Sequence, residues 1–261
     1  RKMPRFHHRA DCKRQGADGR QMEKPCYIAY FQAFTNTYAP VEELRQKYEE
    51  ALACPEIEGL SIATRADCLP ADVLALLAEL KKKQNLWVEL GLQTQDAQSA
   101  AFIRRGYPLS VFTQAVYALA EYNIPLWCIS FSDFPVKAEK PFSGRLIIQP
   151  PAIQGVKLQL LHVLSDSDLA DLYRAGEYTP LEKEEYLALV GDCIAHLRAD
   201  IVLHRLTGDG DKSTLLAPLW SLRKRDVLNH LHRYLRENHI RQGMSCKIDL
   251  SVIYNKPKDV L

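Results

Sequence analysis

The segment Tyr27-Ile-Ala-Tyr-Phe-Gln-Ala-Phe-Thr-Asn-Thr-Tyr-Ala-Pro40 begins as a strand and then becomes abruptly polar. Aromatic and β-branched residues open it, and Gln32, Thr35 and Asn36 follow directly. In parallel α/β barrels, the ligand site is built at the C-terminal ends of the strands. The plainer interpretation of one such segment is a strand, a Thr/Asn turn and a helix that begins at Val41. Whether other strands along the chain also end in polar residues helps to choose between a ligand site and a simple turn.

Strand-like and helix-like segments alternate along the chain. The predicted strands cover residues 27–31, 59–63, 86–90, 124–131, 155–164 and 201–206. The predicted helices cover 41–53, 71–83, 96–104, 112–122 and 181–197, and Pro70 and Pro180 open two of them. This alternation predicts an α/β fold with a parallel sheet. Because four strands end in polar or glycine-containing loops, a shared ligand site is about as well supported as turn chemistry alone.

Composition is ordinary for a globular protein. The chain has 261 residues, 47% of them hydrophobic and 25% charged, which suits one large α/β domain or two small ones. A net charge of +2 does not by itself indicate a nucleic-acid protein. The first 26 residues differ, with eight Lys or Arg against three acids, and the chain does not begin with Met, which suggests a fragment.

Cysteine usage and hydropathy favour the cytoplasm. Seven cysteines are present, an odd number, and no two of them form a Cys-x-x-Cys pair. This argues against a disulfide framework and against a self-evident zinc site, and it favours free thiols. No apolar run approaches the roughly 18 residues of a membrane span, and the first residues lack the apolar core of a signal peptide. We therefore expect a cytoplasmic protein that does not enter a membrane.

Three charged residues lie within or directly after predicted strands. Glu89 lies inside a strand that should be buried on both faces, and a buried carboxylate must be paired or hydrogen-bonded. A structural salt bridge and a ligand contact in a barrel interior both satisfy that requirement. Arg65 and Asp67 follow another strand, either as solvated loop charges or, for Arg65, as a fork for a carboxylate ligand.

The second half of the chain adds further candidates. Lys157 and Gln159 share one face of a predicted strand, whereas His162 lies on the other face by strict alternation. A lone histidine at a strand end is more often structural than catalytic. Asp209 lies between two glycines, which is typical of a turn but also lets the backbone approach a ligand closely.

Together these segments resemble a radical S-adenosylmethionine (SAM) protein related to the catalytic subunit of elongator. The segments are 27–40, 59–70, 86–94, 155–164 and 205–222, and the likeness covers roughly residues 26–127 and 154–243. It implies a partial (βα)6 TIM-type barrel, a [4Fe–4S] cluster held by three cysteines, and SAM at the strand tops. It also implies cleavage of SAM to a 5′-deoxyadenosyl radical, with tRNA as substrate and flavodoxin or ferredoxin as electron donor.

The resemblance implies roles for individual residues. Gln32, Thr35 and Asn36 match the segment near the SAM amino group; the other matched cofactor-binding positions are Arg65, Glu89, Gln93 and Lys157. His162, Arg205 and Asp209 are the implied substrate-binding residues. Ala63, Ala66 and Gln159 depart from the family pattern, which usually has Gly, Pro and His there.

Two larger departures concern the cluster and residues 128–152. The family's cluster cysteines precede the strand that begins at Tyr27, the last two as Cys-x-x-Cys, whereas thirteen residues separate Cys12 from Cys26 and no third partner completes a Cys-x-x-Cys arrangement. Since three thiolates are needed, we expect no stable cluster on this chain. Residues 128–152 lack the family's Gly-Leu-Pro-Gly-Glu loop; alternative codon frames spell it, so we infer a frameshift there and expect a poorly packed loop.

The sequence therefore supports two main hypotheses. The first is a radical SAM enzyme whose cluster segment is missing or mistranslated, and the second is a non-catalytic RNA-binding remnant. A generic barrel enzyme without a cluster fits the motifs less well. We expect a basic irregular segment over 1–26, in which 1–24 is a second candidate for an altered reading frame. A barrel over 27–210 and a helical extension over 211–261 should follow it.

Overall fold

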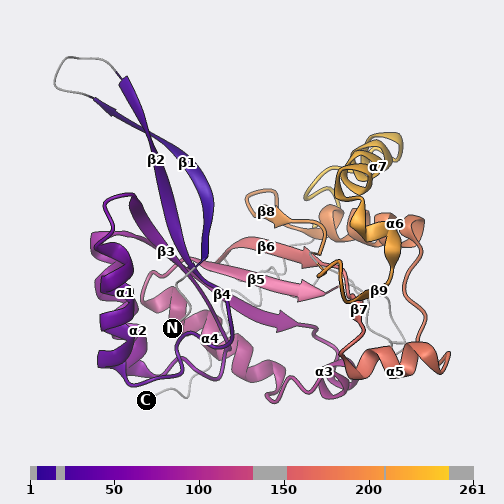
Figure 1. Ribbon diagram of the computed structural model, residues 1–261, viewed down its shortest axis with the longest axis horizontal. Coiled ribbons are helices and arrows are strands. Elements are labelled where there is room, and N and C mark those ends of the chain that lie inside the picture. Colours follow the sequence, from indigo (N-terminus) through magenta and orange to yellow (C-terminus); the bar gives the residue numbers. More distant parts are fainter. Residues whose placement is uncertain (1–4, 16–20, 132–151, 209, 247–261) are drawn as a thin grey trace. The chain divides into compact units, whose positions relative to one another are not determined.

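The computed structural model describes residues 5–15, 21–131, 152–208 and 210–246. Its longer sheet has the strand order β1-β2-β3-β4-β5-β6-β8, and a second sheet pairs β7 with β9 (Figure 1). The strands are β1 (Arg5–Gln15), β2 (Gln21–Phe31), β3 (Ile57–Thr64), β4 (Asn85–Gln93), β5 (Leu126–Phe131), β6 (Ile153–Gln159), β7 (Val163–Leu164), β8 (Val202–Arg205) and β9 (Leu215–Ala217). The helices are α1 (Val41–Leu52), α2 (Ala71–Lys83), α3 (Ala97–Phe102), α4 (Leu109–Glu121), α5 (Asp168–Arg174), α6 (Lys183–His196) and α7 (Lys224–Glu237), with a 3-10 turn η1 (Leu219–Leu222).

The chain divides into two compact units. The first unit comprises residues 1–91 and 110–127, and the second comprises 92–109 and 128–261. In the first unit, β2 pairs with β3 and β3 with β4 in parallel register, from Gly59 opposite Asn85 to Thr64 opposite Leu90. In the second unit, β6 and β8 are also parallel. The expected parallel pairing of the strands that begin near 59 and 86 is confirmed.

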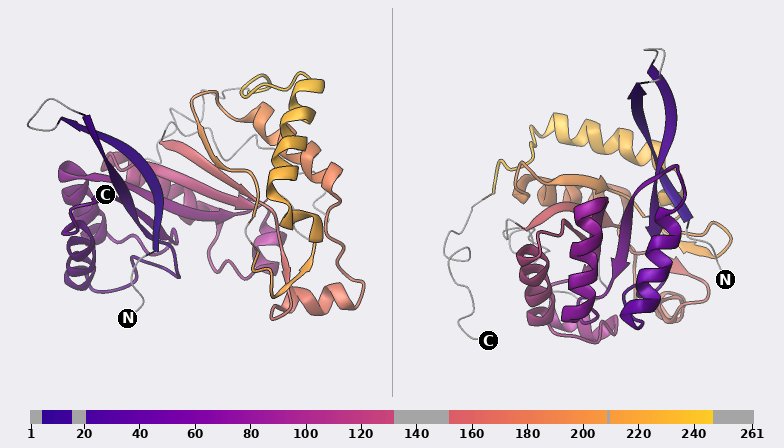
Figure 2. Two further views of the ribbon diagram at one scale, coloured as in Figure 1. Left: turned by 45° about the horizontal axis from the view of Figure 1, so that its top comes forward. Right: turned by 90° about the vertical axis from the view of Figure 1, so that its left-hand side faces the viewer.

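Helices cover one face of the first unit's strands. Helix α1 packs against α2 and β3, and Figure 2 shows both helices beside the strands. The residues of β3 and β4 that point toward this layer are fully buried and apolar, among them Leu60, Ile62, Leu86, Val88 and Leu90. Alternation along the strands then places Ser61 and Glu89 on the opposite face. The apolar half of each strand forms the core, and the polar half is left for a site.

The local chemistry explains why α2 is well predicted. It begins after Pro70, has Asp72 in its first turn and ends in three lysines, an order that complements the helix dipole. Its buried residues are Val73, Leu74, Leu76, Leu77 and Leu80, which form one stripe along the helix.

The observed elements differ from the sequence expectation in several places. Residues 5–15 and 21–31 form an antiparallel pair, β1 and β2, where an irregular segment over 1–26 was expected. The strand expected over 155–164 divides into β6 and β7, because Val163 and Leu164 pair with β9 in the other sheet. Helix α5 was not predicted. Most of the segment 128–152, for which a poorly packed loop was expected, lies outside the described residues.

Candidate functional site

A buried carboxylate marks the polar face of the first unit. Glu89 of β4 is only 1% exposed. The Tyr30 hydroxyl donates to its Oε2 atom at 2.8 Å, and the Ser61 hydroxyl donates to its Oε1 atom at 2.8 Å. Two neutral donors from β2 and β3 therefore solvate the carboxylate in place of water. These contacts meet the requirement that a buried carboxylate be hydrogen-bonded, and the role of Glu89 in ligand binding stays a prediction.

The loop after β2 is fastened by Asn36. Its Nδ2 atom donates to the backbone carbonyls of Phe31 at 2.9 Å and Ala63 at 2.8 Å. The backbone carbonyl of Asn36 accepts a hydrogen bond from the Tyr48 hydroxyl at 2.6 Å. The side chain thus links the ends of β2 and β3. Because the side-chain Nδ2 donates to backbone carbonyls, the side-chain oxygen Oδ1 is the group of Asn36 that could accept a hydrogen bond from a ligand. Gln32 is exposed and Thr35 is half-buried in the same loop.

Arg65 is engaged by its own loop. Its Nε and Nη2 atoms donate to the two carboxylate oxygens of Asp67, at 2.9 and 2.7 Å. The guanidinium holds the pKa of Asp67 below its usual range, and both side chains remain partly exposed. The guanidinium of Arg65, which the sequence suggested for a ligand carboxylate, is bound to the carboxylate of Asp67. A ligand at Arg65 would therefore compete with Asp67.

Gln93 ends β4 in an unusual conformation. Its φ is 65°, in the left-handed region that non-glycine residues seldom adopt. Its side-chain oxygen, Oε1, is buried and accepts no hydrogen bond in the structure. A buried unpaired acceptor is costly to leave unsatisfied, and a ligand that brings a donor would remove that cost. Among the predicted cofactor-binding residues, Gln93 is the one with a buried side-chain acceptor that has no hydrogen-bond partner in the structure.

The second unit holds Lys157, His162 and Arg205. Lys157 is 9% exposed on β6 and lies opposite Arg205 of β8 in the parallel register. The hydroxyl proton of Ser221 is donated to the Pro218 carbonyl, so the Nε2–H of His162 donates to Ser221 at 3.1 Å. Burial and nearby Lys224 lower the pKa of His162, which keeps the imidazole neutral. Asp209 lies outside the described residues.

A basic cavity lies beside these residues, and sequence reasoning missed most of it. It has a volume of about 690 Å³ and is lined by Gly208, Gly210, Lys212, Ser221, Leu222, Arg223, Lys224, Arg225 and Asp226. The two glycines belong to the segment that the sequence did single out. Apart from Lys212, the remaining lining comes from η1 and the start of α7, which we expected only as part of a helical extension. The run Arg223-Lys-Arg-Asp226 was the available signal.

The family follows from comparison with known proteins. The chain is 38% identical over 218 residues to YtqA of Bacillus subtilis, covering 83% of this chain and 68% of that protein. It is 32% identical over 216 residues to YhcC of Escherichia coli K12, covering 82% and 70%. Residues 153–237 match the Radical_SAM C-terminal domain. The chain belongs to the radical SAM-like family of YtqA and YhcC.

A solved structure shares the fold of this radical SAM-like chain. The archaeal Methanocaldococcus infernus Elp3 with an N-terminal deletion (1–46) superimposes with a TM-score of 0.67 at 15% identity. The match covers 82% of this chain but only 55% of that one, so the chain spans about half of the larger protein's length. Strands β2, β3, β4, β5, β6 and β8 form the parallel half-barrel of this fold. The expected α/β partial barrel is confirmed.

The described cysteines of the radical SAM-like chain do not fit a [4Fe–4S] cluster. Within residues 5–15, 21–131, 152–208 and 210–246, no three His, Cys, Asp or Glu side chains are grouped to hold a metal ion. Cys26 is buried in β2 and donates to Glu58 at 3.1 Å. Burial raises the pKa of both Cys128 and Cys193 to about 12, whereas cluster ligands must be thiolates.

Helix length bears on the membrane expectation. Across the part of the chain that the structure describes, no helix is both long enough and apolar enough to cross a membrane.

Proposed function

We propose that this protein binds SAM at the ends of its parallel strands and takes part in the modification of tRNA in the cytoplasm. The observation that carries the proposal is membership of the radical SAM-like family, through 38% identity to YtqA over 218 residues. The match to Elp3 is a likeness of fold, and the tRNA substrate is inferred from the family resemblance of the motifs. An electron donor such as flavodoxin or ferredoxin would serve the complete reaction.

The SAM-binding part of the proposal rests on this chain's own side chains. We assign cofactor binding to the set predicted from sequence: Gln32, Thr35, Asn36, Arg65, Glu89, Gln93 and Lys157. The buried Oε1 of Gln93 lacks a donor, and the ammonium group of SAM is a donor. The amide oxygen of Asn36 offers a second acceptor. No step is assigned to a cluster on this chain, because the described cysteines do not fit one.

Gln93→Met gives a sharp test of SAM binding. Since Oε1 has no protein partner, the substitution removes no hydrogen bond of that oxygen and relieves its desolvation, so it should not lower the free energy of unfolding. It should weaken SAM binding, measured by calorimetry, about tenfold, as expected for a lost hydrogen bond to a charged group. Gln98→Met, at an exposed position of α3, is the matched control and should change neither quantity. Equal SAM affinity in all three proteins would refute the proposed site.

Anaerobic reconstitution separates SAM binding from cluster chemistry. After incubation with iron and sulfide, we expect this chain to retain well below the four irons of a [4Fe–4S] cluster and to form no 5′-deoxyadenosine with dithionite. A brown protein with about four irons that cleaves SAM would show that cysteines other than a compact triad hold the cluster.

The second candidate is an RNA-binding protein without SAM chemistry. The absence of a metal-binding group among the described residues favours it. It predicts tRNA binding that is indifferent to SAM, measured by anisotropy with and without saturating SAM.

A further inference from the structure

The basic cavity of the second unit has the size of a small-molecule site. Its volume of about 690 Å³ falls within the range of roughly 300–1,000 Å³ that is typical of ligand pockets. That is much more than one water or one simple ion requires. Gly208 and Gly210 line one side, where the absence of side chains leaves the backbone accessible.

The charges that line the cavity are mostly uncompensated. Lys212, Arg223 and Arg225 form no ion pair with any described residue, and all three are exposed. Partial burial and the nearby charge of Arg205 lower the pKa of Lys224, which indicates that cations crowd one another here. Like charges held together without a counter-charge repel, so an anion in the cavity would relieve the repulsion.

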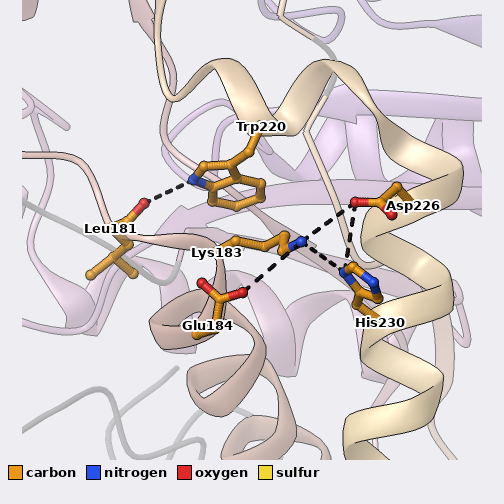
Figure 3. A network of polar contacts seen from close by, with 6 residues as sticks. All are labelled: Leu181, Lys183, Glu184, Trp220, Asp226 and His230. Carbon is orange, nitrogen blue, oxygen red and sulfur yellow. Dashed lines mark hydrogen bonds and ion pairs between the residues drawn. The ribbon is translucent and has the colours of Figure 1, made fainter.

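The one carboxylate in the lining is directed to other partners. Lys183 of α6 donates from Nζ to Asp226 Oδ2 at 3.5 Å and to His230 Nδ1 at 2.7 Å, as Figure 3 shows. The Lys183 charge therefore offsets that of Asp226. Trp220 is fixed beside this network by its Nε1–H bond to the Leu181 carbonyl at 3.1 Å. The lining therefore has four cations and one carboxylate, Asp226, which shares the charge of Lys183 with Glu184.

The start of α7 adds backbone donors to the same wall. The helix is 14 residues long, and its N-cap, Arg223, provides no side-chain hydrogen bond to the first turn. Free N–H groups and the positive end of the helix dipole favour a phosphate oxygen at this position. The start of α7, the unpaired cations and the cavity lie in one place. Together they indicate an anion site, which no one of these features would indicate alone.

We propose that this cavity binds the phosphate of a nucleotide, either free or within an RNA strand. The phosphate lies against the first turn of α7 between Arg223 and Arg225, and the rest of the nucleotide occupies the cavity beside Gly208 and Gly210. This inference does not depend on SAM binding or on the presence of a cluster.

The test compares two double variants of one helix. Arg223→Gln/Arg225→Gln removes two charges from the cavity, and Arg233→Gln/Arg236→Gln removes two from exposed positions of α7 that do not line it. The full chain is titrated with inorganic tripolyphosphate, with AMP and with a fluorescent RNA oligonucleotide, and thermal unfolding checks that each variant folds. Because both variants have the same net charge, any difference between them reports position.

The expected result is binding of at least one phosphate probe. The cavity variant should weaken it tenfold or more, and the control variant by no more than about twofold. Binding of AMP would identify a free nucleotide as the source, whereas binding of the oligonucleotide alone would identify an RNA strand. Equal weakening by both variants, or no binding of any of the three probes by the parent chain, would overturn the proposal.

Discussion

The polar face of the first unit and the basic cavity of the second differ in whether their charged groups are buried and paired. Glu89 is buried, and protein hydroxyls of Tyr30 and Ser61 solvate it. Arg223 and Arg225 are exposed, and no described carboxylate pairs with either. A buried charge must be satisfied by the fold itself, so its removal affects stability first. An exposed unpaired cluster contributes little to folding, and its removal should affect binding first.

The largest expected effect comes from the buried carboxylate. Glu89→Ala leaves the hydroxyls of Tyr30 and Ser61 without their acceptor and opens a cavity, so we expect a loss of about 3 kcal/mol in the free energy of unfolding. Urea unfolding followed by circular dichroism measures it. Glu43→Ala, which removes an exposed ion pair with Lys47 and one acid from the first turn of α1, should cost less than about 1 kcal/mol. Similar losses for the two variants would erase the contrast between buried and exposed charge.

Glycines of the cavity wall should differ from each other. A Cβ at position 208 would lie 2.4 Å from Cε1 and 2.9 Å from Nδ1 of His162, whereas at 210 the nearest atoms would be 3.3 Å away. We expect Gly208→Ala to cost about 2 kcal/mol of unfolding free energy, and Gly210→Ala less than about 1 kcal/mol. Thermal unfolding of both variants gives the comparison. A more harmful substitution at 210 than at 208 would contradict this account of the wall.

The elements of the first unit could be predicted because their signals are local. Helix α2 has its start, its apolar stripe and its basic end within thirteen residues, and its observed bounds equal the predicted ones. Strand β4 was predicted too short, because Gly91 and Gln93 lack strand character by themselves. Glu89 was found because a charge within an apolar run is visible in any sequence.

The cavity could not be predicted because its walls come from distant segments. The segment after Leu160 reads as one continuous strand, but Val163 and Leu164 pair with β9, more than fifty residues later. Gly208 and Gly210 line one cavity with the start of α7, although β9 and η1 separate them in the chain. The bond of His162 to Ser221 likewise joins residues 59 positions apart. The alternation and spacing of apolar residues in a sequence indicate local structure, but they do not indicate which distant segments pair with each other.

Protonation of His162 should weaken the second unit. Burial and Lys224 lower its pKa, so the unfolded state binds a proton more readily than the folded state does. Stability should therefore be complete above the ordinary histidine pKa of about 6.5 and should fall as the pH drops below it. His162→Gln should lose less unfolding free energy than the parent chain between about pH 7.5 and pH 5. Parallel losses in the two proteins would show that this imidazole does not contribute to the pH dependence.

The smallest effect should come from the exposed pair of Arg65 and Asp67. The pair lowers the pKa of Asp67, so its contribution is present above the ordinary carboxyl pKa of about 4 and is lost as the pH falls through the lowered value. Both side chains are about a third or more exposed, and solvent limits the coupling to about 0.5 kcal/mol in a double-mutant cycle of Arg65→Gln and Asp67→Asn.

This pair also links stability to ligand binding. If Arg65 serves a ligand carboxylate, Asp67 competes with that ligand, because the same Nε and Nη2 atoms are used. Asp67→Asn weakens the competitor, and the coupling of about 0.5 kcal/mol then corresponds to about a twofold gain in SAM affinity. Calorimetric titration at low salt, where the surface pair is least screened, is the appropriate measurement. A loss of SAM affinity in Asp67→Asn would mean that Asp67 orients Arg65 for the ligand, and the exposed pair would then belong to the site.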